Sequence, residues 1–147
     1  MTSWSLKKFD ELLPHELYAI LQLRNAVFVV EQNSVYQDCD DKDQHSYHLM
    51  GWKKEILVAY SRLIPPGIAY KNASIGRVVT ATVFRGKNIG RELMILSINY
   101  INELFGQPSV TIGAQLYLKN FYTSLGFVET SDVYLEDGIK HIKMDLH

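Results

Sequence analysis

The segment that most constrains the fold is a β-branched run followed by a short loop and an amphipathic helix. Residues 74–83 are the densest β-branched part of the chain, and they lead into the sequence RGKNIGR at 85–91. Apolar residues then recur at helical spacing over 89–104, until a Gly and a Pro end the run. Gly86 and Gly90 let a ligand approach the backbone, and a helix start offers unpaired N–H donors. The segment predicts a strand, an anion-binding loop and a helix, with room for a pyrophosphate.

Two common phosphate-binding loops do not fit this segment. Gly-Lys-Ser/Thr is missing, so it is not an ATP-binding loop of the Walker A type, and the glycine spacing is not the G-x-G-x-x-G of a dinucleotide site. The ligand is therefore an anion of another kind. For this segment taken alone, a glycine-rich turn with solvated basic residues is an equal alternative.

The rest of the chain predicts one α/β domain over residues 1–147, an ordinary length for a domain of roughly 100–150 residues. Apolar periodicity indicates, besides the segment above, strands at 4–7, 47–53, 55–64 and 109–113, and helices at 13–28 and 114–125. A strand near Phe127 and a turn at Asp137-Gly138 precede a final strand with Ile142, Met144 and Leu146 on one face. The acidic run 38–43 is loop-like.

Charge and composition exclude several classes of protein. The formal net charge is -1 and the pI is about 6.5, so no basic field is available to hold a nucleic acid. The lone Cys39 cannot form an intramolecular disulfide, and the first thirteen residues lack the apolar stretch of a signal peptide. No apolar run approaches the ~20 residues that span a bilayer. We therefore expect a cytoplasmic protein with no nucleic-acid or membrane partner.

No metal is expected either. The pair His45 and His48 lacks the further Cys or carboxylate of a zinc site, and the acidic run 38–43 lacks the glycine and the final Glu of a calcium loop. The acidic run has two other interpretations: it attracts a cationic amine, or it is simply solvated. Both stay open at this point.

Residues 85–90 resemble motif A of the GNAT superfamily, whose loop reads Arg/Gln-x-x-Gly-x-Gly/Ala. Arg85 and Gly90 match, and Asn88 stands at the middle glycine, where Asn is the non-glycine residue that best tolerates a left-handed conformation. The segment 121–127, FYTSLGF, resembles the superfamily's Tyr-x-x-x-Gly-Phe. Further segments resemble the ElaA branch of the superfamily: Arg24 with Val27–Gln32, Ile75–Val78, Ala114-Gln115, Asn120–Tyr122, and Glu136–Ile139 with His141, Ile142 and Met144. The chain departs from that branch at Lys140, where the branch has proline.

The resemblance implies the GNAT fold, an α/β (α+β) architecture whose mixed, mostly antiparallel central sheet splays in the middle and is flanked by helices. It also implies an acyl-CoA-dependent N-acetyltransferase, with acetyl-CoA as co-substrate and no metal. The acetyl group passes directly to a primary amine of a small molecule or peptide while both substrates are bound. The residues that the resemblance assigns to the cofactor are Val78, Val79, Thr80, Arg85, Gly86, Lys87, Asn88, Ile89, Gly90, Arg91, Gln115, Asn120 and Tyr122.

The resemblance further assigns roles in the chemistry. The main chain of Val79, Thr80 and Ala81 pairs with the pantetheine arm like another strand, and one N–H there polarises the thioester carbonyl. Tyr122 matches the position of the acid that protonates the leaving thiolate, although its spacing alone favours a place on an apolar helix face. An amine with a pKa near 10.4 must also lose a proton. The candidates for that base are Glu31, His48, Glu136 and His141, with a preference for Glu31 and His141.

Two other functions remain as alternatives. The first is a sensor or interaction module that binds CoA or acyl-CoA and keeps the cofactor cleft without turnover. Only the presence of Tyr122 argues against it. The second is an acyl-homoserine-lactone synthase, which Glu31-Gln32 resembles, but such enzymes need a longer chain and an S-adenosylmethionine site that is not found. A splayed sheet also offers an exposed strand edge through which a homodimer is possible.

Overall fold

The sheet of the protein is split into two parts that diverge from a common end. The computed structural model describes residues 1–147. The strands are β1 (Ser3–Lys8), β2 (Tyr47–Lys53), β3 (Ile56–Ile64), β4 (Ser74–Thr80), β5 (Val110–Gln115), β6 (Val128–Glu129), β7 (Tyr134–Glu136) and β8 (Ile139–Leu146). The first part has the order β1-β2-β3-β4, and the second has β5-β8-β6 with β7 paired to β8. All these strand pairs are antiparallel.

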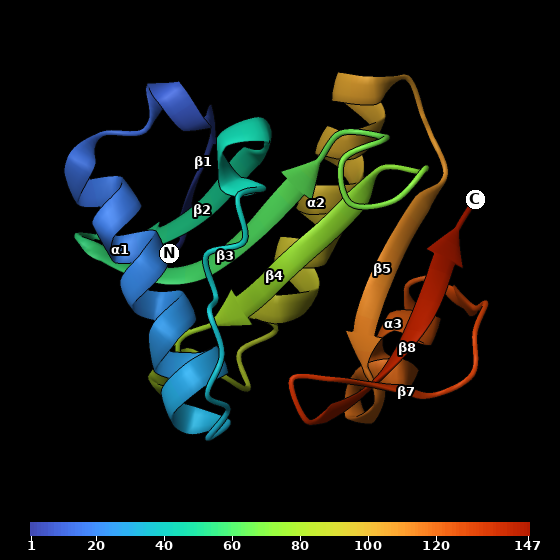
Figure 1. The fold of residues 1–147 in the computed structure, drawn as a ribbon. Coiled ribbons are helices and arrows are strands. Elements are labelled where there is room, and N and C mark those ends of the chain that lie inside the picture. Colours follow the sequence, from blue (N-terminus) through green and yellow to red (C-terminus); the bar gives the residue numbers. More distant parts are fainter.

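The two parts meet through β4 and β5. A parallel bridge joins Ala73 to Val110, and the Thr111 N–H donates to the Ala73 carbonyl at 2.8 Å. Beyond that bridge the two strands separate, as Figure 1 shows. The central sheet is therefore mostly antiparallel and splayed, in agreement with the expected fold.

Helices cover both faces of the first part. They are α1 (Pro14–Arg24), which continues as a π-helix over Asn25–Glu31, and α2 (Ile89–Phe105). The short α3 (Lys119–Ser124) packs against β5 of the second part. Successive residues of a strand point to opposite faces. Accordingly, Leu49 packs against α2 and its neighbour Met50 packs against α1, which lies across the sheet in Figure 1. None of the helices combines the length and apolar composition needed to cross a membrane.

A single apolar cluster ties the two diverging parts together. Met94 and Ile101 of α2 pack in it with Ile75 of β4, Ile112 of β5 and Met144 of β8. These five side chains are at most 3% exposed. The cluster holds β4, β5 and α2 together, and its members Ile75 and Ile112 also line the cleft described below.

Two of the expected elements have the wrong bounds. The predicted helix over 114–125 begins later, because β5 continues to Gln115 and pairs with β8 along its whole length, with Ala114 opposite Ile142. A 3-10 turn over Leu116–Leu118 then leads into α3. The predicted strand over 74–83 ends at Thr80, and Thr82–Phe84 form another 3-10 turn. In both places strand pairing, which is not visible in local periodicity, sets the boundary.

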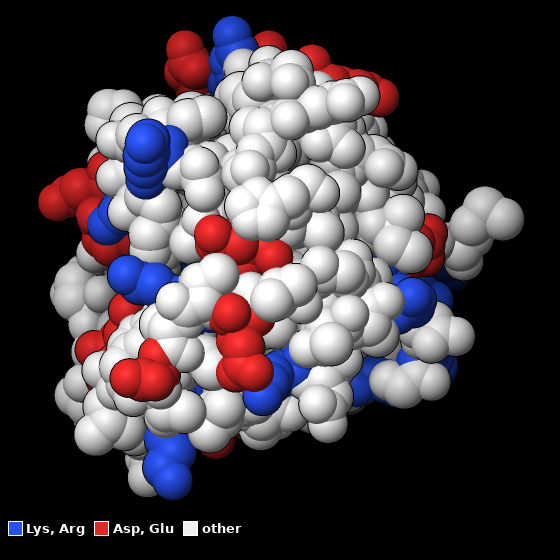
Figure 2. Space-filling view, turned by 90° about the vertical axis from the view of Figure 1, so that its right-hand side faces the viewer, with Lys and Arg blue, Asp and Glu red and all other residues white.

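Charges of both signs are scattered over the C-terminal face of the molecule. Figure 2 shows small groups of Lys and Arg and of Asp and Glu, some of them in contact with each other, between larger uncharged areas. This distribution agrees with the formal net charge of -1.

Candidate active site

A cleft of about 920 Å³ lies between β4 and β5, where the two parts of the sheet diverge. One wall is formed by β4, the loop after it and the start of α2, and the other by β5, α3 and the β7–β8 turn. Residues of the 36–42 segment and of the end of the π-helix also line it. The cleft therefore collects the predicted anion loop, the predicted catalytic tyrosine and several candidate bases.

The edge of β4 that faces the cleft has free main-chain groups. Ala81 donates its N–H to the Val58 carbonyl of β3 at 2.8 Å, and Val79 lies opposite Tyr60 in the same ladder. Because main-chain groups alternate along a strand, the N–H groups of Val78 and Thr80 point away from β3 and into the cleft. These two, and not Val79 and Ala81, are available to a ligand.

The expected pairing through Ala81 is therefore wrong. Its N–H bonds to β3, and its carbonyl accepts a hydrogen bond from the Phe84 N–H at 2.9 Å. An irregularity in the β3–β4 register, opposite Ser61, sets the alternation. Arg77 adopts a positive φ of 49° there, which is rare for a residue with a side chain and is typical of a bulge at a functional site.

The loop before α2 carries a run of unpaired N–H groups. None of the N–H groups of residues 86–91 donates a hydrogen bond within the chain, and the first helical bond runs from Glu92 to the Asn88 carbonyl. Asn88 itself is left-handed, with φ 59° and ψ 14°, as its replacement of a glycine suggested. A side chain at Gly86 would meet nothing within 4 Å, and one at Gly90 would meet only the Thr80 methyl at 3.9 Å. The donors therefore face open space, where an anion can bind.

Glu31 does not have the environment of a general base. Arg85 donates to its Oε1 from Nη2 at 3.0 Å, and the Thr82 hydroxyl donates to the same oxygen at 2.8 Å. The hydrogen bonds and the charge of Arg85 lower the pKa of Glu31. The Glu31 carboxylate also does not line the cleft. The preference for Glu31 as the base is therefore not supported, because its lone pairs are bound by a cation.

Tyr122 of α3 presents an unpaired hydroxyl to the cleft. Its ring is 6% exposed and packs edge-on against Phe121 and Phe127, at centroid distances of 5.2 and 5.9 Å. The hydroxyl makes no hydrogen bond to any other residue of the chain, and Tyr122 lines the cleft. Burial raises the pKa of Tyr122, so the hydroxyl keeps its proton at neutral pH.

His141 of β8 also lines the cleft, and it is held in one tautomer. Its Nδ1 lies 2.7 Å from the Ile139 carbonyl, which can only accept, so Nδ1 carries the proton. Nε2 then has a free lone pair, 3.7 Å from Oε2 of Glu136. The ring of Tyr134 stacks on the imidazole with a centroid distance of 5.9 Å. Two of the four candidate bases, His141 and Glu136, therefore lie together in the cleft.

His48 lies outside the cleft. It is fully buried between the Tyr60 hydroxyl, at 2.6 Å from Nδ1, and the Asp43 carbonyl, at 2.9 Å from Nε2. Burial lowers the pKa of His48, so it is neutral, and both ring nitrogens are already used. His48 is therefore a structural residue and not a base for a substrate.

The remaining predicted cofactor residues divide into two groups. Gln115 lines the cleft and exchanges hydrogen bonds of 2.9 and 3.1 Å with Gln32, which comes from the other wall. Ile89 and Arg91 line it as well, and Arg91 donates to the Ser124 hydroxyl. Asn120 instead borders a separate small depression beside Thr123 and Glu129, away from the cleft. The structure thus does not bring Asn120 to the site.

Lys87 is at the margin of the site. It does not line the cleft, and its Nζ lies over the ring of Phe84, 5.7 Å from the centroid. Its charge is nevertheless on the loop whose N–H groups are free, so it adds to the positive potential there.

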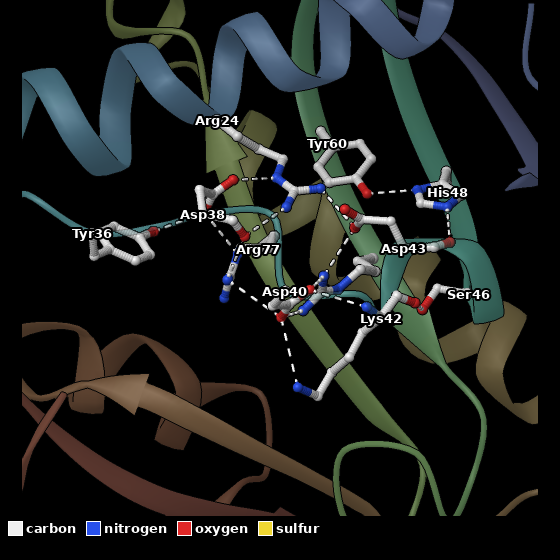
Figure 3. Close-up of polar contacts among 11 residues, drawn as sticks. Arg24, Tyr36, Asp38, Asp40, Lys42, Asp43, Ser46, His48, Tyr60 and Arg77 are labelled. Atoms are coloured by element: carbon white, nitrogen blue, oxygen red, sulfur yellow. Dashed lines mark hydrogen bonds and ion pairs between the residues drawn. The ribbon is translucent and has the colours of Figure 1, made fainter. Parts of the chain in front are cut away.

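Three aspartates of the acidic run, Asp38, Asp40 and Asp43, are neither simply solvated nor free to attract an amine, because three arginines from three elements bind them (Figure 3). The ion pairs are Arg24 Nε with Asp38 at 2.7 Å, Arg24 Nη1 with Asp43 at 2.7 Å, Arg62 Nη1 with Asp40 at 2.7 Å and with Asp43 at 2.9 Å, and Arg77 Nε with Asp38 at 2.9 Å. Burial by itself raises the pKa of Asp40, but the hydrogen bonds and charge of Arg62 outweigh it and hold that pKa well below its usual range.

The sequence contained one signal of this network that the predictions did not use. Arg24 and Arg62 occupy positions within a helical and a strand pattern that are otherwise buried, and they are 0% and 3% exposed. A charged residue on a core face is almost never buried without a partner. The run 38–43, with four aspartates and only one lysine, is the natural partner for such residues.

The chain matches known proteins over almost its whole length. Residues 16–147 match the acetyltransferase (GNAT) domain family. The ElaA protein of Escherichia coli K12 is 42% identical over 98% of this chain and 95% of its own length. Among solved structures, an acyl-CoA N-acyltransferase from Pseudomonas aeruginosa has a TM-score of 0.96 with 40% identity, and Escherichia coli ElaA has 0.94 with 41% identity. Each of these two structures is covered completely, as is this chain. The chain therefore belongs to the GNAT acetyltransferase family, as an acyltransferase similar to ElaA.

Proposed function

We propose that the protein transfers an acetyl group from acetyl-CoA to a primary amine, with both substrates bound in the cleft at the same time. The observation that carries this proposal is the continuous line of unpaired main-chain donors along one wall. It begins at the free edge of β4 and continues through the N–H groups of residues 86–91 at the start of α2. An extended pantetheine arm ending in a pyrophosphate has the chemistry that such a line can bind.

The residues present fit coenzyme A. The pyrophosphate would be held by the N–H groups of residues 86–91, with Arg91 beside them, and the open space at Gly86 and Gly90 leaves room for it. Val78 and Thr80 would pair with the amides of the pantetheine arm through their outward main-chain groups. Bound there, acetyl-CoA supplies an activated acyl group. An N–H donor at the end of β4 would then stabilise the negative charge that develops on the carbonyl oxygen.

His141 is the group best placed to take the proton of the amine. A primary amine has a pKa near 10.4, so it is almost wholly protonated at neutral pH and must lose a proton before it reacts. Nε2 of His141 has the free lone pair for this step, directly or through water. The Glu136 carboxylate at 3.7 Å would stabilise the imidazolium that results.

Tyr122 is the group that we assign to the leaving thiolate. The amine nitrogen forms the new C–N bond, the C–S bond breaks, and the sulfur takes the proton of the Tyr122 hydroxyl. Burial keeps that proton on Tyr122 until it is needed, and no residue of the chain competes for it. The tyrosinate then recovers a proton from solvent or from the amine side.

The test has two parts. Calorimetry with acetyl-CoA and with CoA measures binding, and free thiol released from acetyl-CoA measures transfer to a panel of amino acids, peptides, polyamines and alkylamines. We expect binding of both cofactor forms and amine-dependent release of thiol. Binding with no release on any amine would support a CoA-binding sensor and refute catalysis. Failure of both forms to bind at millimolar concentration would refute the site itself.

A further inference from the structure

The end of the cleft nearest the 36–43 segment has an excess of one positive charge. Four cationic side chains meet three carboxylates there: Arg24, Arg62, Arg77 and Lys42 against Asp38, Asp40 and Asp43. The other titratable groups of the cluster are neutral, because burial lowers the pKa of His48 and raises those of Tyr36 and Tyr60. Asp41 is exposed and does not line the cleft. The network therefore ends in one uncompensated cation.

That excess charge is carried by groups that reach the cleft. Arg24 is completely buried, and both carboxylate oxygens of Asp40 accept from Arg62 at 2.7 and 2.8 Å. Lys42, in contrast, makes no hydrogen bond through Nζ, which lies 3.9 Å from Asp40. Figure 3 shows its side chain extending from the network toward the other wall. Nη1 of Arg77 also donates to nothing in the chain, and both residues line the cleft.

The opposite wall has the opposite charge. Glu136 and Asp137 of the β7–β8 turn line the cleft, and neither carboxylate forms an ion pair with a Lys or Arg. An ammonium group is favoured next to these carboxylates, and a carboxylate is favoured next to Lys42 and Arg77. The acceptor half of the cleft is thus complementary to a molecule with one positive and one negative end.

We infer that the acceptor is an amine that also bears a single carboxylate, such as an amino acid or a short peptide. This inference rests on the proposed acetyl transfer and names the substrate class of the same site. The carboxylate binds Lys42 and the free Nη1 of Arg77, and the amine points to His141. A phosphate group would bring nearly two negative charges to a wall with an excess of one, so a carboxylate is the better match. The carboxylate takes no part in bond making and is retained in the N-acetylated product.

The experiment compares acceptors that differ only in the carboxylate. 6-Aminohexanoate is paired with hexylamine and 4-aminobutanoate with butylamine, and kcat/KM is measured by thiol release from acetyl-CoA. We expect each amino acid to exceed its alkylamine by about 10-fold or more, the effect of one charge-assisted contact. Alkylamines that react as well as the amino acids would overturn the inference while leaving the proposed function intact.

A variant of Lys42 distinguishes a specific contact with the substrate carboxylate from a general effect of charge. Lys42→Gln should lower kcat/KM for the amino acids by about 10-fold and leave the alkylamines within about 2-fold. Lys54→Gln, at an exposed turn between β2 and β3, is the matched control and should change neither. Equal losses for both classes of amine in Lys42→Gln would contradict carboxylate recognition.

A binding measurement covers the case in which no amine is acetylated. That result would refute the proposed transfer, and the product analogue 6-acetamidohexanoate would then be titrated against N-hexylacetamide by calorimetry. Saturable binding of the acid that Lys42→Gln weakens would support the carboxylate site by itself. No preference for the acid over the neutral amide would overturn it.

Discussion

Replacing Tyr122 by Phe removes a single oxygen atom and so tests its part in catalysis separately from its part in stability. The ring is 6% exposed and packs edge-on against Phe121 and Phe127, and Phe keeps those contacts. The hydroxyl has no partner in the chain, so the substitution breaks no protein hydrogen bond. The hydroxyl oxygen opens on the cleft and is not one of the buried polar atoms that lack a partner, so its removal relieves little desolvation cost. We therefore expect the free energy of unfolding of Tyr122→Phe to be unchanged or slightly higher.

The effect on turnover should be much larger. Loss of a general acid lowers kcat by roughly 10-fold to 10⁴-fold, or about 1.4 to 5.4 kcal/mol in the activation barrier. Coenzyme affinity should stay near normal, because the main-chain donors of residues 86–91 are untouched. In the unmodified protein, burial raises the pKa of Tyr122, so the acid stays protonated above the ordinary tyrosine value near 10. Its kcat should therefore not fall at pH values where an exposed tyrosine ionises.

The assay measures kcat by thiol release, cofactor affinity by calorimetry and the free energy of unfolding in urea. Tyr100→Phe is the matched control, since Tyr100 lies on α2, is partly buried and does not line the cleft. Unchanged turnover in Tyr122→Phe would remove this residue from the mechanism. An equal loss of turnover in Tyr100→Phe would show that removing a tyrosine hydroxyl outside the cleft has the same effect, and would refute a specific catalytic role for the Tyr122 hydroxyl.

Four further outcomes are expected. Gly90→Leu should lower CoA affinity at least about 10-fold in calorimetry without lowering the Tm, because Leu is a better helix former than Gly but fills the phosphate space. His141→Gln should reduce kcat/KM by about 10²-fold to 10⁴-fold. Arg24→Leu should lower the free energy of unfolding in urea by about 3–5 kcal/mol, because buried carboxylates lose their partner. Stability should fall in two acid steps. Below about pH 6.5 the unfolded state protonates His48 first, and below about pH 4 it also protonates Asp40, so the stability that each group contributes is lost progressively, since both pKa values are lowered by folding.

The controls for these outcomes use the same chain. Gly90→Ala adds one methyl group that meets only Thr80 at 3.9 Å, and full CoA affinity in Gly90→Leu would move the phosphate site elsewhere. His15→Gln, at an exposed position of α1, should leave kcat/KM unchanged. A loss below about 1 kcal/mol in Arg24→Leu would mean that the buried pairs add nothing net. A stability curve that is flat between about pH 7 and 5 would contradict a neutral His48.

Elements whose pattern of apolar residues lies within one continuous segment were predicted from that pattern. The β2–β3 hairpin, β1, α2 with its left-handed Gly106 cap and the buried face of β8 all agree with the periodicity of the chain. The boundaries that failed are those set by partners distant in sequence. β5 extends through Ala114 because β8 pairs with it, and β4 stops at Thr80, after which the chain turns toward the anion loop.

The same distinction between local patterns and distant partners applies to the residues of the candidate site. The anion loop and Tyr122 belong to contiguous motifs, and the structure places both in the cleft. The choice among bases needed the fold, because Glu31 differs from His141 only in what surrounds it: Arg85 binds one, and a carbonyl fixes the tautomer of the other. The role of Asn120 failed for a similar reason, since the direction of a side chain on a short helix depends on its packing.

The sequence by itself determined the family, the strand-loop-helix that offers unpaired amides, and the contiguous motif that contains Tyr122, because each depends on neighbours along the chain. Only the tertiary structure decided the charge at the end of the cleft nearest the 36–43 segment. The acidic run 38–43 looks negative in sequence, yet Arg24, Arg62 and Arg77 come to it from three other elements and neutralise Asp38, Asp40 and Asp43, which leaves Lys42 as the excess cation on the wall of the cleft. Charge at a site is a sum over residues close in space, and the fold alone brings those residues together.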